Sequence, residues 1–340
     1  LGAGVQPLVT LHHGDLPQAL EDDGGWLNRN TVERFAEFAG LVGERYADRV
    51  EQWVPVNEPS VLAYRGYVTG EYAPGRRLML DALPVSHHLL LAHGRAAIAL
   101  RAAGATSVGC ANNHVPMWPA NDDAANVGAT KLFDALWNGM FIEPMLLGRY
   151  PVDLAPLLED LVRVGDMATI RQPLDFYGIS YDHPLRVAAA DEDAEMPFEF
   201  WDLVGYPITD DGSPVVPDAL RELLITLRAR YRAALPPIVV TGAGCAYGAG
   251  PDPDGVVDDQ ARIDHLQGHL RAVSTAIQRG VDVRGYYAWS LLDGFAWSAG
   301  LGQRFGLVHV DHQTQVRTPK RSFAWYADLI AAHKSPVDPR

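Results

Sequence analysis

The stretch Gln52-Trp53-Val54-Pro55-Val56 is a short, mostly apolar run, and the polar pair Asn57-Glu58 follows it directly. A run of about four to eight apolar, aromatic or β-branched residues between turn formers is typical of a buried strand. Five further runs share this character: Pro7–Leu11, Ser107–Ala111, Leu174–Ile179, Pro237–Thr241 and Val283–Trp289. We predict a strand at each of them.

Helical patterns lie between these strand candidates. Thr31–Val50 carries apolar residues at three- and four-residue steps, and Asp258–Gly280 does so between an acidic start and a glycine stop. Alternation of strands and helices, with no block made of strands alone, predicts a parallel sheet covered by helices. Ala188–Pro197 and Gly248–Gly255 are rich in Pro, Gly or acidic residues and are predicted to be loops.

Residues suited to chemistry or binding stand at or just after the ends of the predicted strands. They are His13, Asp15, Asn57, Glu58, Asn112, Asn113, Ser180, Asp182, Gly242 and Trp289. In a (β/α)8 barrel the carboxyl ends of all strands meet at one face, where the site lies. A doubly wound sheet would need a glycine-rich phosphate loop after an early strand, and this sequence has none there. We therefore predict an α/β fold of the (β/α)8 TIM-barrel type.

The barrel is expected to be incomplete. About six strand–helix units are visible, so we expect about the first two βα units to be missing from this chain. We expect residues 1–340 to form a single, N-terminally incomplete barrel domain. Such a barrel exposes the edges of its first and last visible strands. This exposure favours self-association, or completion of the barrel by the missing N-terminal segment.

Composition excludes several kinds of partner. The chain has 42 acidic and 28 basic side chains and a formal net charge of −14, which argues against nucleic acid or an anionic membrane. No apolar run approaches the roughly 18 residues of a membrane-spanning helix. Cys110 and Cys245 cannot form a disulfide framework, so we expect both to be unpaired and inert. This cysteine usage fits a reducing compartment, and we expect a cytoplasmic location.

Eight segments, spread over essentially the whole chain, are similar to motifs of glycoside hydrolase family 1, the retaining β-glucosidases, and follow the family's order. They are LHHGDLPQ at 11–18, GGWLN at 24–28, NEP at 57–59, YAPG at 72–75, DFYGI at 175–179, AWSLLD at 288–293, RFGLV at 304–308 and RTPK at 317–320. One short motif would be weak evidence, but eight in order make coincidence negligible. The resemblance implies the barrel fold predicted above.

The chemistry that this resemblance implies needs two carboxyl groups about 5–5.5 Å apart, one to protonate the leaving oxygen and one to attack the anomeric carbon. Glu58 matches the family's acid/base. The nucleophile position is Gly242, within Ile238–Gly244, and a glycine has no side chain with which to attack. We therefore expect retaining hydrolysis to be abolished. Without the nucleophile's charge, we also expect Glu58 to ionise more readily near neutrality and to suit a base, unless burial or Asp182 supplies the shift instead.

Further departures from the family pattern stand at the barrel mouth, mostly where the family carries bulkier or sugar-binding side chains. These positions are Gly14, Ser60, Ser180, Ser213, Ala243, Gly294, Ala296 and Leu301. Because the changes gather at the mouth rather than in the helices or the core, they indicate that the barrel is retained and that the sugar-binding site is lost. We expect an enlarged pocket that is poor in sugar-binding hydrogen bonds.

Asp182 stands where the family has a tyrosine, and it is either a replacement catalytic group or a solvated loop acid. His13, Asn57, Trp289 and Trp297 still match the family and are our substrate-binding candidates. We expect His13 to hydrogen-bond near the pocket floor, with a direct catalytic role as the alternative. The two tryptophans either stack on a ligand or cap the barrel core.

The histidines do not predict a metal site. His12, His13, His87, His88 and His93 lack the convergent cysteine or carboxylate spacing that a metal site requires. We expect neither a metal nor another cofactor.

These observations favour a repurposed enzyme. In this hypothesis Glu58, aided by Asp182 or His13, moves a proton on a bulky or glycosylated small molecule held in the enlarged pocket. One alternative is a non-catalytic pseudoenzyme that binds a small molecule or glycoside. Another is an engineered variant of a β-glucosidase of the glycoside-synthesising kind, although the loss of a sugar-holding carboxylate at Ala296 speaks against it.

Overall fold

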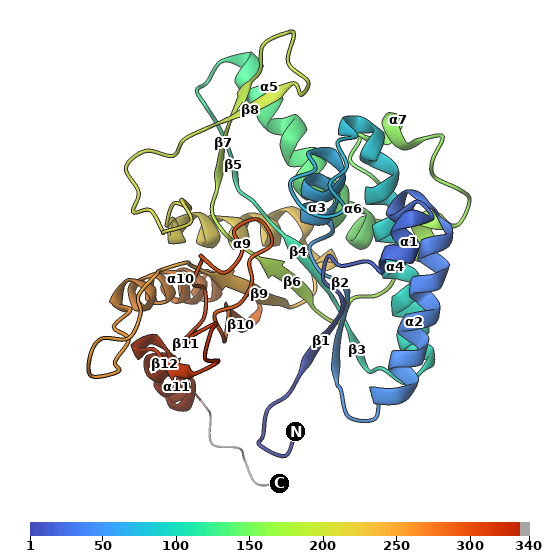
Figure 1. The fold of residues 1–340 in the computed structure, drawn as a ribbon. Helices are drawn as coiled ribbons and strands as arrows, with labels where there is room; N and C mark the ends of the chain where they lie inside the picture. The colour runs from blue at the N-terminus through green and yellow to red at the C-terminus, as the bar shows by residue number, and fades with distance from the viewer. Residues whose placement is uncertain (334–340) are drawn as a thin grey trace.

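The structure is a computed structural model and describes residues 1–333. A parallel sheet forms the centre of the molecule (Figure 1), and its strands are those that the sequence predicts. In spatial order they are β1 (Leu8–His12), β2 (Gln52–Val56), β3 (Ser107–Val108) continuing as β4 (Cys110–Asn113), β6 (Tyr177–Ser180), β9 (Ile238–Gly244) and β10 (Val283–Trp289). A parallel bridge between Asn57 and Ala111 joins β2 to β4.

The main helices match the predicted periodicity, with small differences at their ends. The predicted helix at Thr31–Val50 is α2 (Asn30–Tyr46), and the one at Asp258–Gly280 is α10 (Gln260–Gln278). The other helices are α1 (Gln18–Asp22), α3 (Pro59–Val61), α4 (Leu83–Ala102), α5 (Ala124–Asp134), α6 (Met140–Leu147), α7 (Ala155–Leu158), α8 (Asp166–Ile170), α9 (Pro217–Tyr231) and α11 (Arg321–His333). Short 3-10 or π turns lie at Gly25–Leu27, Leu62–Val68, Met79–Ala82, Ala135–Gly139 and Arg232–Ala234.

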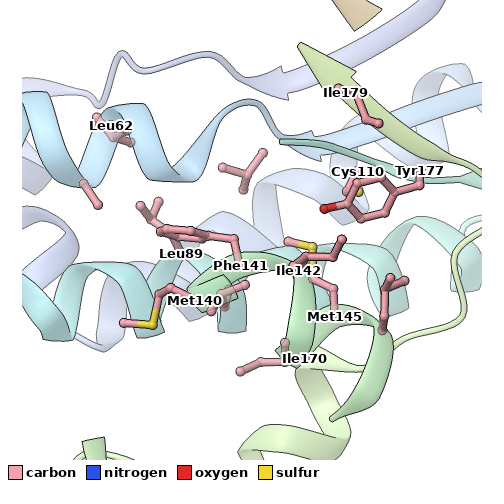
Figure 2. Packing of buried hydrophobic residues seen from close by; sticks show 14 of the residues in the cluster. Leu62, Leu89, Cys110, Met140, Phe141, Ile142, Met145, Ile170, Tyr177 and Ile179 are labelled. Atoms are coloured by element: carbon pink, nitrogen blue, oxygen red, sulfur yellow. The ribbon is translucent and has the colours of Figure 1, made fainter. Parts of the chain in front are cut away.

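The largest core cluster lies between the sheet and the helices that cover it. Figure 2 shows part of it, with Cys110 of β4 and Tyr177 of β6 near Met145 of α6, and Leu89 of α4 near Phe141 of α6. Both cysteines are free and buried, and burial raises the pKa of each thiol to about 12. A thiol with such a pKa is a poor nucleophile at neutral pH. Both cysteines are thus unpaired, as predicted, and the raised pKa values agree with the prediction that they are inert.

The sequence missed a small second sheet. It consists of β5 (Met117–Pro119), β7 (Leu185–Ala189) and β8 (Phe198–Trp201), and it lies beside α5 away from the central sheet (Figure 1). A hairpin of β11 (Val308–Val310) and β12 (Arg317–Pro319) was also missed. The expectation of no block made of strands alone is thus wrong, since β7 and β8 follow each other with no helix between them. The stretch Ala188–Pro197, predicted to be a loop, begins inside β7 and ends directly before β8. Packing of Phe198 against Phe133 of α5, with ring centroids 4.6 Å apart, stabilises this sheet through a contact distant in sequence.

The central sheet has two outer strands, β1 and β10. Within residues 1–333 neither strand pairs with another strand on its outer side. Tyr287 and Trp289 of β10 are exposed, as are Phe38 and Leu41 of α2. The predicted consequences of such edges, self-association or completion by a missing N-terminal segment, stay predictions. Within the same residues, no helix combines the length and the hydropathy needed to cross a membrane.

The chain that follows β10 is tied to the β11–β12 hairpin by a buried ion pair. Asp293 is buried and accepts hydrogen bonds from Lys320 Nζ at 3.0 Å, Arg304 Nη1 at 3.3 Å and the Gly306 backbone at 2.8 Å. The side chain of Lys320 is fully buried too. Because neither charge is hydrated, each one depends on the other for its compensation.

We expect Lys320→Met to lower the free energy of unfolding by about 3 kcal/mol, because Asp293 would stay buried with one of its two cations removed. Urea unfolding followed by circular dichroism measures this change. Arg284→Met is the matched control, since Arg284 forms an exposed ion pair with Asp282 at 2.9 Å and should contribute little. Equal effects of the two substitutions would contradict this account.

Candidate active site

Glu58 is placed by the junction between β2 and α3. It adopts a left-handed backbone conformation, with φ 45° and ψ 57°, which is uncommon for a residue with a side chain. Its backbone N–H donates to the carbonyl of Ala111 in β4 at 2.7 Å, and Pro59 begins α3 directly after it. The strained turn is therefore fixed from both sides, and it holds the half-buried Glu58 side chain at the carboxyl ends of β2 and β4.

Asn113, at the end of β4, organises the neighbouring groups. Its amide nitrogen donates to Asp182 Oδ2 at 3.1 Å, and its amide oxygen accepts from the Trp137 indole nitrogen at 3.1 Å. The second bond fixes the orientation of the amide, so that the nitrogen faces the carboxylates. Asp182 follows β6, whose Ser180 is in register with Asn113. The structure thus brings the predicted residues Glu58 and Asp182 into one site.

The pKa of Glu58 is raised to about 7, first by burial and then by the negative charge of Asp182. The expectation that Glu58 would ionise more readily allowed one exception, in which burial or Asp182 supplies the shift instead. Both raise the pKa here, so the exception applies. Glu58 therefore retains its proton to about pH 7, which makes it suited to donate a proton as well as to accept one.

Gly242 lies at the same sheet edge, near the end of β9 and in register with Ser180. A Cβ atom added to Gly242 would contact only the Ser180 Cβ, at 3.6 Å, so a side chain could be accommodated there. The Ser180 side chain is buried beside the Glu58 carboxyl and acts to lower its pKa, against the larger effects of burial and of Asp182. The space at Gly242 thus adjoins a residue that acts on Glu58.

His13, Trp289 and Trp297 form the rim of the site. His13 Nε2 lies 3.4 Å from Asn57 Nδ2, and the His13 ring centroid lies 5.9 Å from that of Trp289. The predicted position of His13 near the pocket floor is wrong, since its side chain is exposed. The two tryptophans are 50% and 42% exposed, so they do not cap the core and their rings are free to contact a ligand.

Two of the positions predicted to be emptied do not open the pocket. Gly14 has φ +84°, and a Cβ atom on it would lie 3.3 Å from the Trp297 ring, so Trp297 already occupies the adjoining space. Ala243 is 1% exposed and belongs to the main core cluster. Successive residues of a strand point to opposite faces, which directs Ala243 away from the side on which Gly242 lies.

Ser60 is buried and borders a separate cavity of about 50 Å³, whose lining also includes Tyr64, Met79 and Trp137. Space is therefore present beside Ser60, but it adjoins Trp137 and is distinct from the open space at Gly242. Of the five remaining predicted positions, Ser180 ends β6 and the other four lie in loops. Ser213 is bonded within its own turn to Asp211, and Gly294, Ala296 and Leu301 follow β10.

A polar hollow of about 490 Å³ adjoins the rim. It is lined by Gln18, Glu21, Asp22 and residues 70–76. Tyr72 connects it to the rim, because the Tyr72 ring centroid lies 6.0 Å from that of Trp297. Sequence reasoning missed both this hollow and Trp137. The hollow forms between α1 and the loop of residues 70–76, and the π turn Ala135–Gly139 brings Trp137 to Asn113, so each depends on contacts between distant parts of the chain.

The histidine-rich part of α4 has a structural role. His87 contacts Asp166 at 2.9 Å and Tyr150 at 2.7 Å, and His88 contacts the carbonyl of Trp26 at 2.8 Å. Within the described part of the chain, no three or more His, Cys, Asp or Glu side chains are grouped so that they could hold a metal ion.

Comparison with known proteins agrees with the fold. The model of glycosyl hydrolase family 1 matches residues 1–335. A β-glucosidase of Agrobacterium sp. is 39% identical over 337 residues, which are 96% of this chain and 72% of that protein. A thermostable β-glucosidase B of Thermobispora bispora is also 39% identical, over 97% of this chain and 69% of its own length.

Solved structures are equally similar. The crystal structure of a psychrophilic β-glucosidase, BglU, from Micrococcus antarcticus matches with a TM-score of 0.93 and 40% identity, over 98% of this chain and 76% of that one. Family 1 β-glucosidase from Thermotoga maritima matches with a TM-score of 0.91 and 35% identity, over 97% and 74% of the two chains. These similarities identify the parallel sheet as that of a (β/α)8 barrel fold. The chain therefore belongs to glycosyl hydrolase family 1.

Proposed function

We propose that this family 1 protein has lost the covalent step of retaining glycoside hydrolysis and uses Glu58 to transfer a proton on a bulky or glycosylated small molecule. One observation carries the proposal. Glu58 and Asp182 lie together at the sheet edge around the amide of Asn113, whereas β9 presents Gly242 to the same edge. A retaining mechanism needs a nucleophilic carboxylate facing the acid. The residue pair found here supplies a proton donor with a charged neighbour.

In the proposed reaction Glu58 protonates a departing oxygen, and the charge of Asp182 keeps Glu58 protonated until about pH 7. In ring closure and acetal rearrangement, a group of the substrate forms the new bond to the carbon that the oxygen leaves, and in hydrolysis water forms it. In elimination no group replaces the oxygen, because a neighbouring carbon loses a proton to a base, Asp182 or His13, and a double bond forms. The open space at Gly242 and the exposed Trp289 and Trp297 support a substrate larger than the family's sugar site would accept.

A non-catalytic binding protein is the second candidate. The exposure of both rim tryptophans favours it, since aromatic rings at the mouth of a pocket bind apolar and sugar faces without any chemistry. The two candidates differ in what Glu58 does, because only the enzyme requires its proton.

We expect a titration of the Glu58 carboxyl to give a midpoint near pH 7, and Asp182→Asn to move this midpoint to lower pH, because the substitution removes a negative charge beside Glu58. Infrared difference spectra against Glu58→Gln isolate its carboxyl band. Asp191→Asn, at an exposed loop position, is the control and should leave the midpoint unchanged. A midpoint at the ordinary value for glutamate would remove the basis for Glu58 as a proton donor.

We expect Glu58→Gln to reduce turnover by roughly 100-fold to 10,000-fold on any substrate found by screening aryl and phenolic glycosides, while the dissociation constant stays unchanged. The amide keeps the size of the side chain but cannot donate the proton. Product formation and calorimetric binding measure the two effects separately. Unchanged turnover would refute the enzymatic proposal, and binding without turnover in the unaltered protein would favour the second candidate.

We expect Gly242→Glu to increase hydrolysis of an aryl β-glucoside at least tenfold, with retained configuration, because a carboxylate fits beside Ser180 and restores the missing nucleophile. Chromogenic assay and proton NMR of the first-formed sugar measure rate and configuration. Gly242→Gln has the same size without the charge and should give no increase. If the two variants are equally inactive, the loss at Gly242 is not what prevents retaining hydrolysis.

A further inference from the structure

The cavity beside Ser60 is separate from the site at the strand ends. It lies between the π turn Leu62–Val68 and the helices α4, α5 and α6, and it shares no lining residue with the polar hollow at the rim. One of its walls is Trp137, whose indole nitrogen donates to Asn113 at 3.1 Å. A molecule in this cavity would therefore contact the residue that orients the amide of Asn113.

The walls of the cavity are apolar and uncharged. The rings of Tyr64, Phe133 and Trp137 form one side and pack against one another, with centroids 5.4 to 5.8 Å apart. Within residues 1–333, no Asp, Glu, Lys, Arg or His side chain lines the cavity. An ion placed here would lose its hydration without compensation, so the cavity selects uncharged molecules.

Ser60 brings an unsatisfied hydroxyl to this apolar space. The residue is 3% exposed, and its Oγ has no hydrogen-bond partner in the structure. A buried hydroxyl without a partner is unfavourable, because it has given up its bond to water and received none in return. A molecule with a single hydrogen-bonding group would supply the missing partner.

The cavity is adaptable and reaches towards the surface. Three of its lining residues are methionines, Met79, Met140 and Met196, whose unbranched side chains adjust to the shape of a neighbour. Met79 has a positive φ of 48°, which is uncommon for a residue with a side chain, and the adjacent Leu80 is 49% exposed. We expect a ligand to enter beside Leu80.

The size of the cavity limits what it holds. One water molecule needs about 10–15 Å³, so a cavity of about 50 Å³ accommodates roughly four groups of that size. A buried water makes about three hydrogen bonds, whereas the lining side chains offer only the hydroxyls of Ser60, Tyr64 and Ser86, since the Trp137 nitrogen is already bonded. A short carbon chain with one polar end fits these walls better than a cluster of waters does.

We propose that the Ser60 cavity is a second ligand site, which binds a small uncharged alcohol of about three to five carbon atoms. The hydroxyl of the ligand bonds to Ser60 Oγ, and its carbon chain lies against the aromatic rings and the methionines. The proposal concerns binding in a cavity separate from the site of the proposed function, and it requires no reaction.

1-Butanol and n-butylammonium test the proposal, because they have the same carbon chain and differ in charge. Trp137 lines the cavity, so tryptophan fluorescence reports occupancy. 1-Butanol should give a saturable change with a dissociation constant of about 1–10 mM, as expected for a ligand of so few atoms. n-Butylammonium should give no saturable change at the same concentrations. Crystals soaked in 1-butanol, or held under xenon, should show density beside Ser60.

Ser60→Ala should weaken 1-butanol binding about fivefold, because the hydrogen bond is lost, and should leave xenon occupancy unchanged. Ser60→Leu should abolish the binding of both, because the larger side chain fills the cavity. Near-ultraviolet circular dichroism checks that each variant keeps the native fold. Ser274→Ala and Ser274→Leu, at an exposed position of α10, are the matched controls and should change neither affinity.

Density that consists of water alone, no saturable response to 1-butanol, or an equal response to n-butylammonium would each overturn the proposal. Undiminished binding of 1-butanol by Ser60→Ala would overturn it as well, and this test stands even where Ser60→Leu does not fold. Absence of Glu58-dependent turnover would refute the proposed function alone, because none of these measurements requires a reaction.

Discussion

The parallel alignment of β2, β4, β6 and β9 is the constraint on which the site depends. Because all four strands run in the same direction, their carboxyl ends reach one edge of the sheet. The register then decides which residues are neighbours: Asn113 lies beside Ser180, and Ser180 lies beside Gly242. A slip of one residue in any of these pairs would turn its side chains to the other face of the sheet. The hydrophobic core beneath the strands fixes that register.

The pKa of Glu58 depends more on the groups that surround this residue than on the absence of a side chain at Gly242. The loss of a carboxylate at Gly242 would by itself lower the pKa of Glu58. Burial and the charge of Asp182 outweigh that loss, and the pKa is raised to about 7. Asp182, which follows β6, thus supplies a charge that Gly242, near the end of β9, cannot supply. The same charge underlies the proposed proton transfer.

The rim depends on a second buried electrostatic unit. Asp293, Lys320 and Arg304 hold the chain after β10, the segment that carries Trp297. Trp297 in turn lies over Gly14, where a side chain would contact its ring at 3.3 Å. The absence of a side chain at residue 14 therefore allows the Trp297 ring to lie where it does. For this reason, replacement of large residues by small ones at the mouth did not produce empty space at every position.

The sequence by itself determined the strands of the central sheet, their parallel direction and the edge at which Glu58, Asp182 and Gly242 lie, because these features follow from local hydrophobic patterns and chain direction. Segment order also identified the family. The sequence could not determine the pKa of Glu58, the exposed position of His13, the burial of Ala243 or the role of Trp137. Each of these depends on atoms brought together from distant parts of the chain, and desolvation and charge coupling act only between groups that the tertiary structure has placed in contact.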